Sequence, residues 1–286
     1  MLPKRTGLIS RSTIVESLLY PYRLQRPKRV LSTSPMPSDK VKILNVWIDN
    51  FSMQEFLEQL KSGFVITPNV DHLMKLQHDA EFRYVYSQAD YRVCDSQILM
   101  YAARFLGTPL KEKISGSDFF PHFCRYHRSN PGIKVFLLGG APGVAESARQ
   151  NVNRRVGRDI VVAAHSPSFG FERNYRECLE IVDQINASGA TVLAVGVGAP
   201  KQEKWIEKHR ALLPNIKIFL AVGAALDFEA GNIQRAPKWV SNIGMEWLFR
   251  ISRDPKRLWK RYLVEDVPFF GLLLKQKLGL YRPPLN

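Results

Sequence analysis

Residues 192–205 read Val-Leu-Ala-Val-Gly-Val-Gly-Ala-Pro-Lys-Gln-Glu-Lys-Trp. The first half is a short apolar run rich in valine, which predicts a buried strand. Gly196 and Gly198 then open a turn, and Pro200 suits the first turn of a helix. A strand, a glycine turn and a helix N-terminus together form a place where backbone N–H groups can bind an anion. The alternative is a plain strand-to-helix connection that binds no ligand. The rest of the sequence is needed to distinguish these two interpretations.

The same order of elements recurs on both sides of this stretch. Strands are predicted at 64–67, 91–94, 133–138, 160–164, 191–195 and 216–222, and helices at 70–88, 96–105, 117–128, 144–155, 174–186 and 201–212. A further strand is predicted at 43–49, followed by a helix with Ser52 and Glu55 as its capping box. Strands that alternate with such helices indicate βαβ units. We therefore expect an α/β fold, a Rossmann-like and mostly parallel sheet with helices on both faces.

Small or polar residues follow the ends of the predicted strands. Right-handed crossovers place the carboxyl ends of parallel strands along one edge of the sheet, where ligands bind. The residues at these ends are Asn69, Asp95, Gly139, Gly140, Gly198 and Asp227. Asp95 is the candidate base, because a carboxylate at this edge can take a proton from a bound hydroxyl. The alternative is that Asp95 only caps the helix that follows it.

The glycine turns do not form a dinucleotide-binding fingerprint. Residues 139–143 read Gly-Gly-Ala-Pro-Gly rather than G-x-G-x-x-G, and Lys201 stands where the other turn needs its third glycine. The strand that should end in an acid to hold a ribose ends in His165. This argues against a nicotinamide oxidoreductase, although a nucleotide diphosphate can still bind these turns. Asp227-Phe-Glu is only loosely similar to a D-x-D metal site, so we predict neither a metal ion nor a cofactor.

Positive charge is concentrated at the two ends of the chain. The formal net charge is +15; residues 1–40 contain eight Lys and Arg against two acidic residues, and residues 246–286 contain nine against four. Basic segments bind nucleic acid, anionic membrane surfaces or phosphorylated substrates. The three cysteines are far apart, which suits a reducing compartment and argues against a disulfide framework or a zinc site.

Composition divides the chain into three expected parts: a basic disordered arm (1–40), an α/β core (41–231) and a basic helical C-terminal appendage (232–286). The arm lacks the apolar stretch of a secretory signal, which leaves an organelle transit peptide as an alternative. The appendage mixes Arg and Lys with aromatic residues and contains the short apolar run 267–274. That pattern is typical of a helix lying in a membrane interface, and the alternative is a solvated face on a packed terminal helix. No run reaches the roughly 18 apolar residues of a membrane span.

Several short motifs occur in one order over residues 41–265. They are Thr67-Pro-Asn69, Asp95 with its helix, Ile114-Ser-Gly-Ser-Asp118, Leu138-Gly-Gly140, Gly198-Ala-Pro-Lys-Gln-Glu203, Asp227-Phe-Glu-Ala-Gly231, Arg235-Ala-Pro-Lys-Trp239 and Gly244-Met-Glu-Trp-Leu-Phe-Arg250. Each motif alone is weak, but the ordered set is specific. It resembles the WecG/TagA/CpsF glycosyltransferases (glycosyltransferase family 26).

The resemblance implies an inverting, metal-independent transferase of bacterial surface polysaccharide biosynthesis. Such an enzyme moves a sugar from a UDP-sugar to a polyprenyl-pyrophosphate-linked sugar, as a peripheral protein on the cytoplasmic face of the inner membrane. Its expected partners are these two substrates and an anionic membrane surface, with a homo-oligomer left open and no nucleic acid. Two alternatives stand beside it. One is a nucleotide-sugar-modifying enzyme without a lipid acceptor, and the other is a basic nucleic-acid-binding protein, for which the sequence lacks a recognition signature.

The resemblance also implies roles for individual residues. Asp95 is the general base, Thr67 and Asn69 line its pocket, and Gln202 faces the nucleotide sugar. The other expected substrate-binding residues are Lys113, Gly139, Gly140, Gly198, Lys201, Asp227, Arg250, Arg253 and Arg257. The chain departs from the family at two positions. Ser96 replaces a usual glycine after the catalytic aspartate, and Lys113 replaces a frequent arginine, which turns a bidentate phosphate contact into a point charge.

Overall fold

A computed structural model of the chain describes residues 40–233, 248–249, 259–260 and 264–284. The predicted N-terminal arm therefore lies outside the described residues, apart from Lys40. Most of the predicted helical appendage between residues 234 and 263 lies outside them as well. Arg250, Arg253 and Arg257 are also outside, so their predicted contacts with a pyrophosphate stay predictions.

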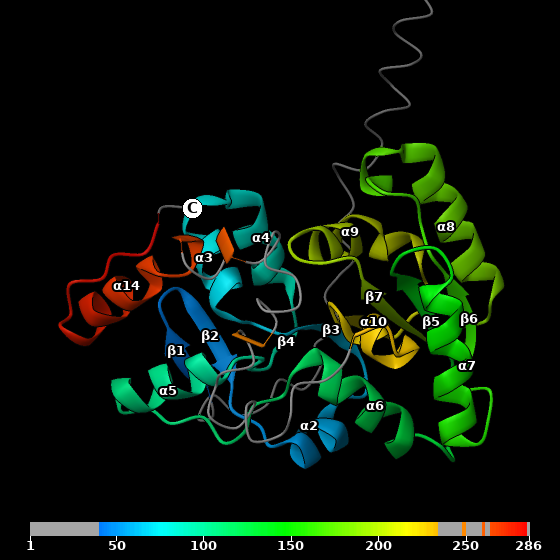
Figure 1. Cartoon of the computed structure of the whole chain (residues 1–286), viewed down its shortest axis with the longest axis horizontal. Helices are drawn as coiled ribbons and strands as arrows, with labels where there is room; N and C mark the ends of the chain where they lie inside the picture. Colours follow the sequence, from blue (N-terminus) through cyan, green and yellow to red (C-terminus); the bar gives the residue numbers. More distant parts are fainter. Residues whose placement is uncertain (1–39, 234–247, 250–258, 261–263, 285–286) are drawn as a thin grey trace, which may run out of the picture. The chain divides into compact units, whose positions relative to one another are not determined.

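A six-stranded parallel sheet forms the centre of the described chain (Figure 1). Its order is β4-β3-β8-β7-β5-β6, and every neighbouring pair is parallel. The strands are β3 (Gly63–Ile66), β4 (Tyr91–Arg92), β5 (Val135–Gly139), β6 (Val161–His165), β7 (Val192–Gly196) and β8 (Ile218–Ala221). The prediction of a parallel α/β sheet is confirmed.

Helices cover both faces of this sheet. Val192 and Ala194 of β7 belong to one hydrophobic core, whereas Leu193 and Val195 belong to the other, as the period of two in a strand requires. The first core includes α2 (Met53–Gln59), α6 (Gly116–Tyr126), α7 (Val144–Val156) and α10 (Ala225–Ala230). The second includes α3 (Val70–His78), α4 (Ala80–Gln88), α5 (Gln97–Leu106), α8 (Tyr175–Ala187) and α9 (Lys201–His209).

Local hydrogen bonding changes three of the predicted elements. The predicted strand 43–49 is an antiparallel hairpin of β1 (Lys40–Ile43) and β2 (Val46–Asp49), with Leu44 at φ 51° in its turn. The predicted helix 70–88 is two helices, because Asp79 is extended and its carboxylate caps α4 by accepting from the Phe82 N–H. The helix predicted at 117–128 is α6, which begins at Gly116 and is capped by Ser115.

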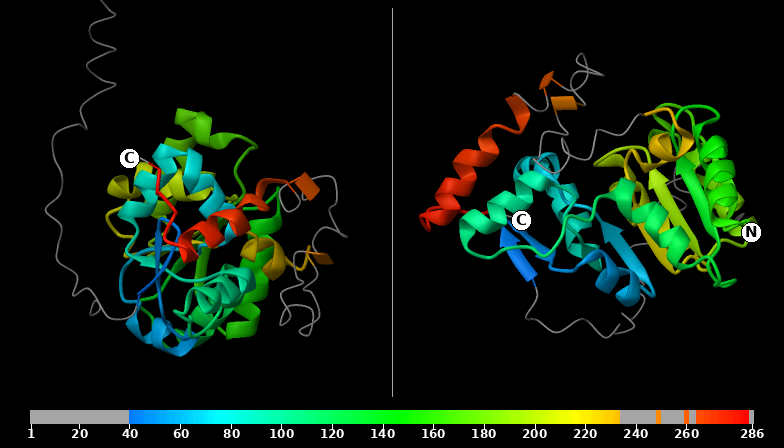
Figure 2. Two further views of the ribbon diagram at one scale, coloured as in Figure 1. Left: turned by 90° about the vertical axis from the view of Figure 1, so that its left-hand side faces the viewer. Right: turned by 60° about the horizontal axis from the view of Figure 1, so that its bottom comes forward.

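Helix α14 (Pro268–Lys277) packs against α3 and α5 (Figures 1 and 2). Phe269 and Leu273 are buried in the same core as α3 and α5. Gln276 bonds to the β1–β2 turn, accepting from the Leu44 N–H at 2.7 Å and donating to the Lys42 carbonyl at 3.0 Å. One side of the apolar run 267–274 therefore belongs to the protein core. Within the described residues, no helix is both long and apolar enough to cross a membrane.

Candidate active site

The strand order contains a switch point between β5 and β7. From β5 the chain passes through α7 to β6, which is the neighbour of β5 on one side. It then passes through α8 to β7, which is the neighbour of β5 on the other side. Ligands of open α/β sheets bind at the carboxyl ends of strands at such a point. The two predicted glycine turns are located there, since Gly139 and Gly140 end β5 and Gly196 ends β7.

The glycines allow the strand ends to approach each other closely. The Gly140 N–H donates to the Gly196 carbonyl at 3.3 Å. A Cβ atom on Gly139 would lie only 2.4 Å from that same oxygen, and one on Gly196 would lie 2.6 Å from the Gly223 oxygen after β8. Only glycine fits at these positions, so the ends of β5 and β7 present bare backbone, which we call the glycine floor.

Three helices begin at this floor. Among the described residues no side chain caps α7, α9 or α10 through its N-cap position, whereas Ser, Asn or Asp side chains cap α2, α3, α4, α5, α6 and α8. The first N–H groups of a helix have no partner within the helix and carry its positive dipole end. At the start of α7 the Ala145 N–H donates to the Ser166 hydroxyl at 3.3 Å. The remaining N–H groups of these starts can donate to a phosphate group.

Asp95 lies at the same edge of the sheet. It follows β4, and its backbone N–H donates to the Pro68 carbonyl, just after β3, at 2.9 Å. Ser96 caps α5, because its hydroxyl accepts from the Leu99 N–H at 3.4 Å. The alternative interpretation of Asp95 as the helix cap is therefore wrong, and the residue that departs from the family pattern performs that task.

Thr67 and Asn69 follow β3 beside Asp95. The buried Thr67 hydroxyl lies 3.5 Å from the Ala221 carbonyl at the end of β8. The Asn69 side-chain oxygen caps α3 by accepting from the His72 N–H at 3.0 Å. With its oxygen engaged, the Asn69 amide can still donate through its nitrogen to a ligand. The structure thus brings these two predicted residues to the Asp95 end of the edge.

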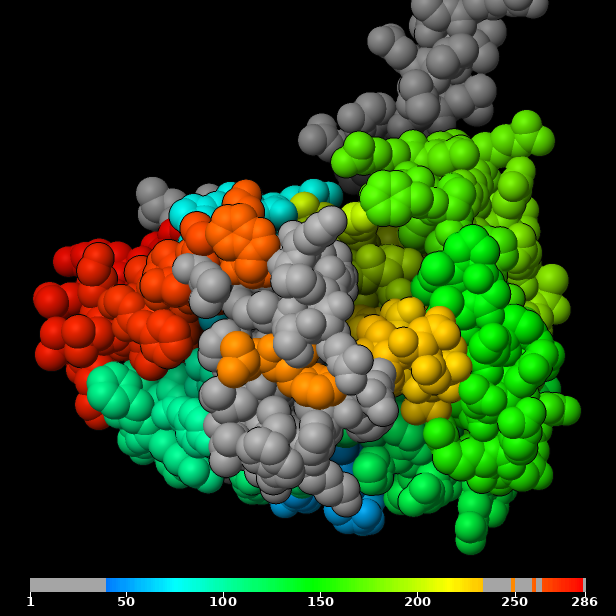
Figure 3. Space-filling view, in the orientation of Figure 1, coloured from blue at the N-terminus to red at the C-terminus, as the bar shows by residue number. Residues whose placement is uncertain are grey.

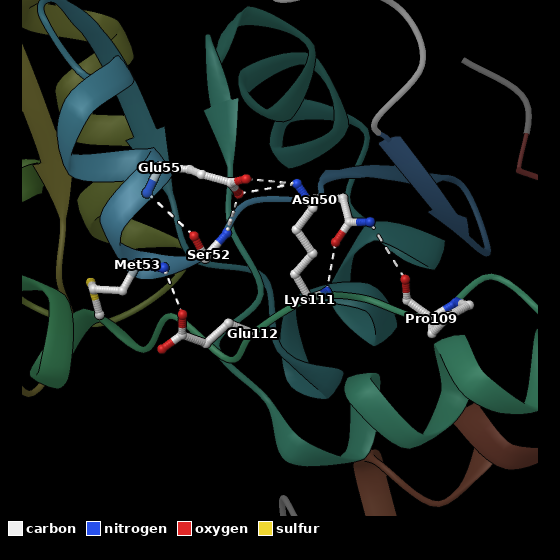
Figure 4. Close-up of polar contacts among 7 residues, drawn as sticks. All are labelled: Asn50, Ser52, Met53, Glu55, Pro109, Lys111 and Glu112. Carbon is white, nitrogen blue, oxygen red and sulfur yellow. Dashed lines mark hydrogen bonds and ion pairs between the residues drawn. The ribbon is translucent and has the colours of Figure 1, made fainter.

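The loop that carries Lys113 is fixed against α2 (Figure 4). Lys111 bonds to the Asn50 side chain through its N–H (2.7 Å) and to Glu55 through its ammonium group (2.9 Å), and Glu112 accepts from the Met53 N–H at 2.7 Å. The predicted capping box is present, and the Ser52 N–H, followed by Lys111, lowers the pKa of Glu55.

The same loop continues onto the strand ends. The Ile114 N–H donates to the Cys94 carbonyl at 2.7 Å, and Gly116 lies against the Val222 backbone, where a Cβ would be 2.8 Å from the carbonyl oxygen. Lys113 precedes Ile114 and Asp95 follows Cys94, so each is next to one partner of this hydrogen bond. This geometry agrees with the prediction that Lys113 serves the site.

Gln202 ties two of the turns together. Its buried amide oxygen accepts from the Gly198 N–H (3.3 Å) and the Gly223 N–H (3.2 Å), and its amide nitrogen donates to Glu203 (2.7 Å). The side chain therefore holds the turn after β7 to the turn after β8. Its predicted direct contact with a nucleotide sugar stays a prediction.

Lys201 and Asp227 lie at other points of the edge. The Lys201 ammonium group is 3.7 Å from a Glu172 oxygen and 5.0 Å from the centre of the Phe169 ring, in the segment that follows β6. Asp227 is on α10, after β8, and its carbonyl accepts from the Asn232 N–H. The predicted residues that the structure describes therefore follow the strands of one edge from β4 to β6.

The distance along this edge is set by the strand spacing. Asp95 follows β4 and the Gly198–Gln202 turn follows β7, three strand positions away. At about 4.8 Å per position this is roughly 14 Å, which a nucleotide diphosphate sugar with its acceptor can span. In the ranges that the structure describes, no three His, Cys, Asp or Glu side chains gather in a way that could hold a metal ion.

Comparison with known proteins decides the family. A profile of the glycosyl transferase WecG/TagA/CpsF family matches residues 41–283. The chain belongs to this family of glycosyltransferases. An N-acetylglucosaminyldiphosphoundecaprenol N-acetyl-beta-D-mannosaminyltransferase of Bacillus spizizenii is 29% identical to it over 229 residues, which cover 80% of this chain and 85% of the relative. The resemblance predicted from the ordered motifs is confirmed.

A cysteine nucleophile has no support in this WecG/TagA/CpsF glycosyltransferase. Burial raises the pKa of the Cys94 thiol, the cysteine next to Asp95, to about 12, so the thiol stays protonated at neutral pH. Burial also raises the pKa of Cys124 and of Cys178. Asp95 therefore stays the predicted base at the β4 end of the edge.

The sequence prediction for this family member missed Glu203. This carboxyl group is fully buried, and burial raises its pKa to about 7. A signal was available in the sequence. Glu203 is three residues before the apolar Ile206, so the spacing of a helix places it on the face that packs into the core.

Proposed function

We propose that this glycosyltransferase moves a hexosamine from a UDP-sugar onto a sugar linked to polyprenyl pyrophosphate, with inversion at the anomeric carbon. The observation that carries the proposal is the common edge of Asp95 and the glycine floor with its helix starts. The Bacillus spizizenii relative supports this choice of substrates. Its name specifies transfer of an N-acetylmannosaminyl group to an undecaprenyl diphosphate-linked N-acetylglucosamine.

In this reaction Asp95 takes the proton of the acceptor hydroxyl as that oxygen attacks the anomeric carbon. The bond to the UDP oxygen breaks on the opposite side of the sugar, so one displacement inverts the configuration. One carboxylate beside the acceptor is sufficient for this mechanism, because no covalent enzyme intermediate forms. Thr67 and Asn69 are at the right end of the edge to orient the acceptor.

The diphosphate gains negative charge as it leaves. Hydrogen-bond donors fixed in advance around that charge lower the barrier without reorganisation. The uncapped helix starts at β5, β7 and β8 offer such donors, and Lys113 and Lys201 offer cations at the two ends of the edge. Metal independence and contacts from Arg250, Arg253 and Arg257 belong to the same proposal.

The acceptor lipid places the reaction at a membrane, and α14 offers a surface for it. Val267, Phe270, Leu274 and Leu278 recur at helical spacing and are each at least half exposed. Tyr101 and Phe105 of the neighbouring α5 are also exposed. We call these six side chains the apolar face. In Figure 3, α14 and α5 lie next to each other on the surface shown.

Lysines border the apolar face. Lys275 and Lys277 are in the last turn of α14, and the Lys277 ammonium group lies 5.6 Å from the centre of the Phe105 ring. Apolar side chains bordered by lysines suit the interface of an anionic bilayer. We therefore place the enzyme at the membrane surface as a peripheral protein, on the cytoplasmic side where nucleotide sugars are made.

A donor panel tests the reaction. The purified chain is incubated with UDP-N-acetylmannosamine, UDP-N-acetylglucosamine or UDP-glucose, each with and without a polyprenyl-pyrophosphate N-acetylglucosamine. We expect UDP release and a lipid-linked disaccharide only when both substrates are present. Consumption of a UDP-sugar without any lipid would instead support an enzyme that modifies soluble donors. Release of UDP with no new lipid product would refute the transfer.

A further inference from the structure

Glu203 is a buried carboxyl group that the proposed mechanism does not use. It occupies the first turn of α9, directly after Gln202, and no part of its side chain reaches solvent. One carboxyl oxygen accepts from the Gln202 amide nitrogen at 2.7 Å. The other is buried without a hydrogen-bond partner among the described residues. A buried acid with a missing partner weakens a fold, so its presence needs a reason other than stability.

The surroundings of Glu203 do not compensate its charge by direct pairing. The charged groups near it on α3 are Asp71 and Lys75, and Tyr86 faces it from α4. The Lys75 ammonium group is instead bonded to Asp71 (2.7 Å) and to the Ala199 carbonyl (3.3 Å). The side-chain hydrogen bond that the carboxyl group accepts therefore comes from Gln202, beside a contact with the backbone N–H of Glu203 itself.

That hydrogen bond determines which way the Gln202 amide points. A carboxylate only accepts hydrogen bonds, so it draws the NH₂ end of the amide toward itself. The oxygen end then faces the two N–H groups of Gly198 and Gly223. If the amide were reversed, its NH₂ group would face two other donors and both glycine N–H groups would lose their acceptor.

The two turns joined by this amide belong to different strands. Gly198 follows β7 and Gly223 follows β8, and the two residues are 25 positions apart in sequence. The Gly198 turn leads directly into α9, and the Gly223 turn holds it to the end of β8. A change in the amide would therefore shift the start of α9, whose N–H groups are proposed to bind the diphosphate.

We propose that Glu203 is a positioning residue for the nucleotide-sugar donor, which acts by fixing the Gln202 amide between the Gly198 and Gly223 turns. The proposal rests on the proposed function, because it assumes that these turns bind the donor. It assigns Glu203 no contact with the substrate. Its effect is expected in the KM for the donor and in UDP affinity, with a smaller effect on kcat.

Three variants separate this role from a general effect on folding. Glu203→Met removes the acceptor but keeps the volume, and it introduces no buried charge. Glu203→Gln keeps an acceptor oxygen at the same place. Glu207→Met is the matched control, because Glu207 is one turn further along α9, is also partly buried with a raised pKa, and pairs with Arg210 rather than with a turn.

UDP affinity by calorimetry and donor KM in the transfer assay are the measurements. We expect Glu203→Met to weaken UDP binding and raise the donor KM about ten-fold, Glu203→Gln to stay within about three-fold of the wild type, and Glu207→Met to leave both unchanged. Equal values for Glu203→Met and the wild type would overturn the inference. Equal losses in Glu203→Met and Glu207→Met would do so too.

A double-mutant cycle tests whether Glu203 acts through Gln202. If it does, Gln202→Met and the double variant Gln202→Met/Glu203→Met have the same UDP affinity, because the group that Glu203 orients is already absent. Additive losses would overturn the inference. Should Glu203→Met fail to fold, Gln202→Met against the wild type still tests the joining amide, and unchanged UDP affinity there would overturn the proposal. A wild type that binds no UDP would refute the proposed function itself, which is a distinct result.

Discussion

The backbone N–H of Asp95 donates a hydrogen bond of 2.9 Å to the carbonyl of Pro68. This bond holds the end of β4 to the end of β3, so the main chain of Asp95 is fixed to the sheet while Ser96 caps the next helix. Asp95 can therefore be changed without removing a helix cap.

For that reason we expect Asp95→Asn to fold normally and to lose transfer by about 100-fold or more, the range of a general base. Asp90→Asn is the control. Asp90 is at the other end of β4, where its side chain accepts from the Phe64 N–H at 2.8 Å, and an asparagine can keep that bond. Initial rates with lipid acceptor, beside melting temperatures, check both. Full activity in Asp95→Asn would remove it from the role of base.

Gly196 tests the steric requirement of the glycine floor alone, because its φ, unlike that of Gly139, is not in the left-handed region. An added Cβ would lie 2.6 Å from the Gly223 carbonyl oxygen, which is backbone and cannot move aside without shifting β8. We expect Gly196→Ala to lower the free energy of unfolding by about 2 kcal/mol or more, as overpacking does. Gly271→Ala in α14 meets nothing within 4 Å, and we expect it to raise stability by about 0.5–1 kcal/mol. Urea denaturation of both variants measures the contrast; equal midpoints would contradict it.

Sequence alone predicted all six strands of the central sheet, because each is a short apolar run followed by a glycine or a polar residue. It did not predict the turn at Leu44, where a leucine adopts a positive φ. That conformation is unfavourable locally, but Gln276, 232 residues away, accepts the Leu44 N–H. A pattern of neighbouring residues contains no information on such a bond.

The candidate site shows the same limit. Asp95 and the glycine turns were predicted, since each is a local feature at a strand end. The hydrogen bond from the Gly223 N–H to the Gln202 side chain was not predicted. It joins the ends of β7 and β8, and only the order of the strands in the sheet brings those ends together. Likewise, the pattern of the run 267–274 indicated an apolar helix. Packing against α3 and α5 decided that Phe269 is in the core while Phe270 is exposed.

The exposed half of α14 predicts membrane attachment that can be removed without unfolding the protein. In Phe270→Ser/Leu274→Ser, both changed side chains are more than half exposed, so we expect an unchanged melting temperature. Flotation with phosphatidylglycerol liposomes should fall several-fold, because apolar insertion and lysine attraction act together. Tyr84→Ser/Tyr175→Ser is the control, since these exposed aromatic residues are on α4 and α8. Flotation equal to the wild type would rule out the apolar face as the attachment site.

Glu203 predicts a pH dependence of stability. Burial raises its folded pKa from 4.5 to about 7. The stability contributed by such a group is fully present below the unfolded pKa and is lost as the pH rises through the folded pKa. Glu203→Gln stays neutral throughout, so its stability relative to the wild type should increase by up to about 3 kcal/mol between pH 4.5 and pH 8.

Melting curves of the wild type, Glu203→Gln and Glu207→Gln at half-unit pH steps measure this difference. Glu207 is the matched control, because burial raises its pKa as well, but the pairing with Arg210 opposes that effect. We expect the difference for Glu203→Gln to grow chiefly between pH 5 and 7, and that for Glu207→Gln to change less. A constant offset for Glu203→Gln across the whole range would mean that folding does not raise the pKa of this carboxyl group, and its burial would then need a cation that compensates the charge.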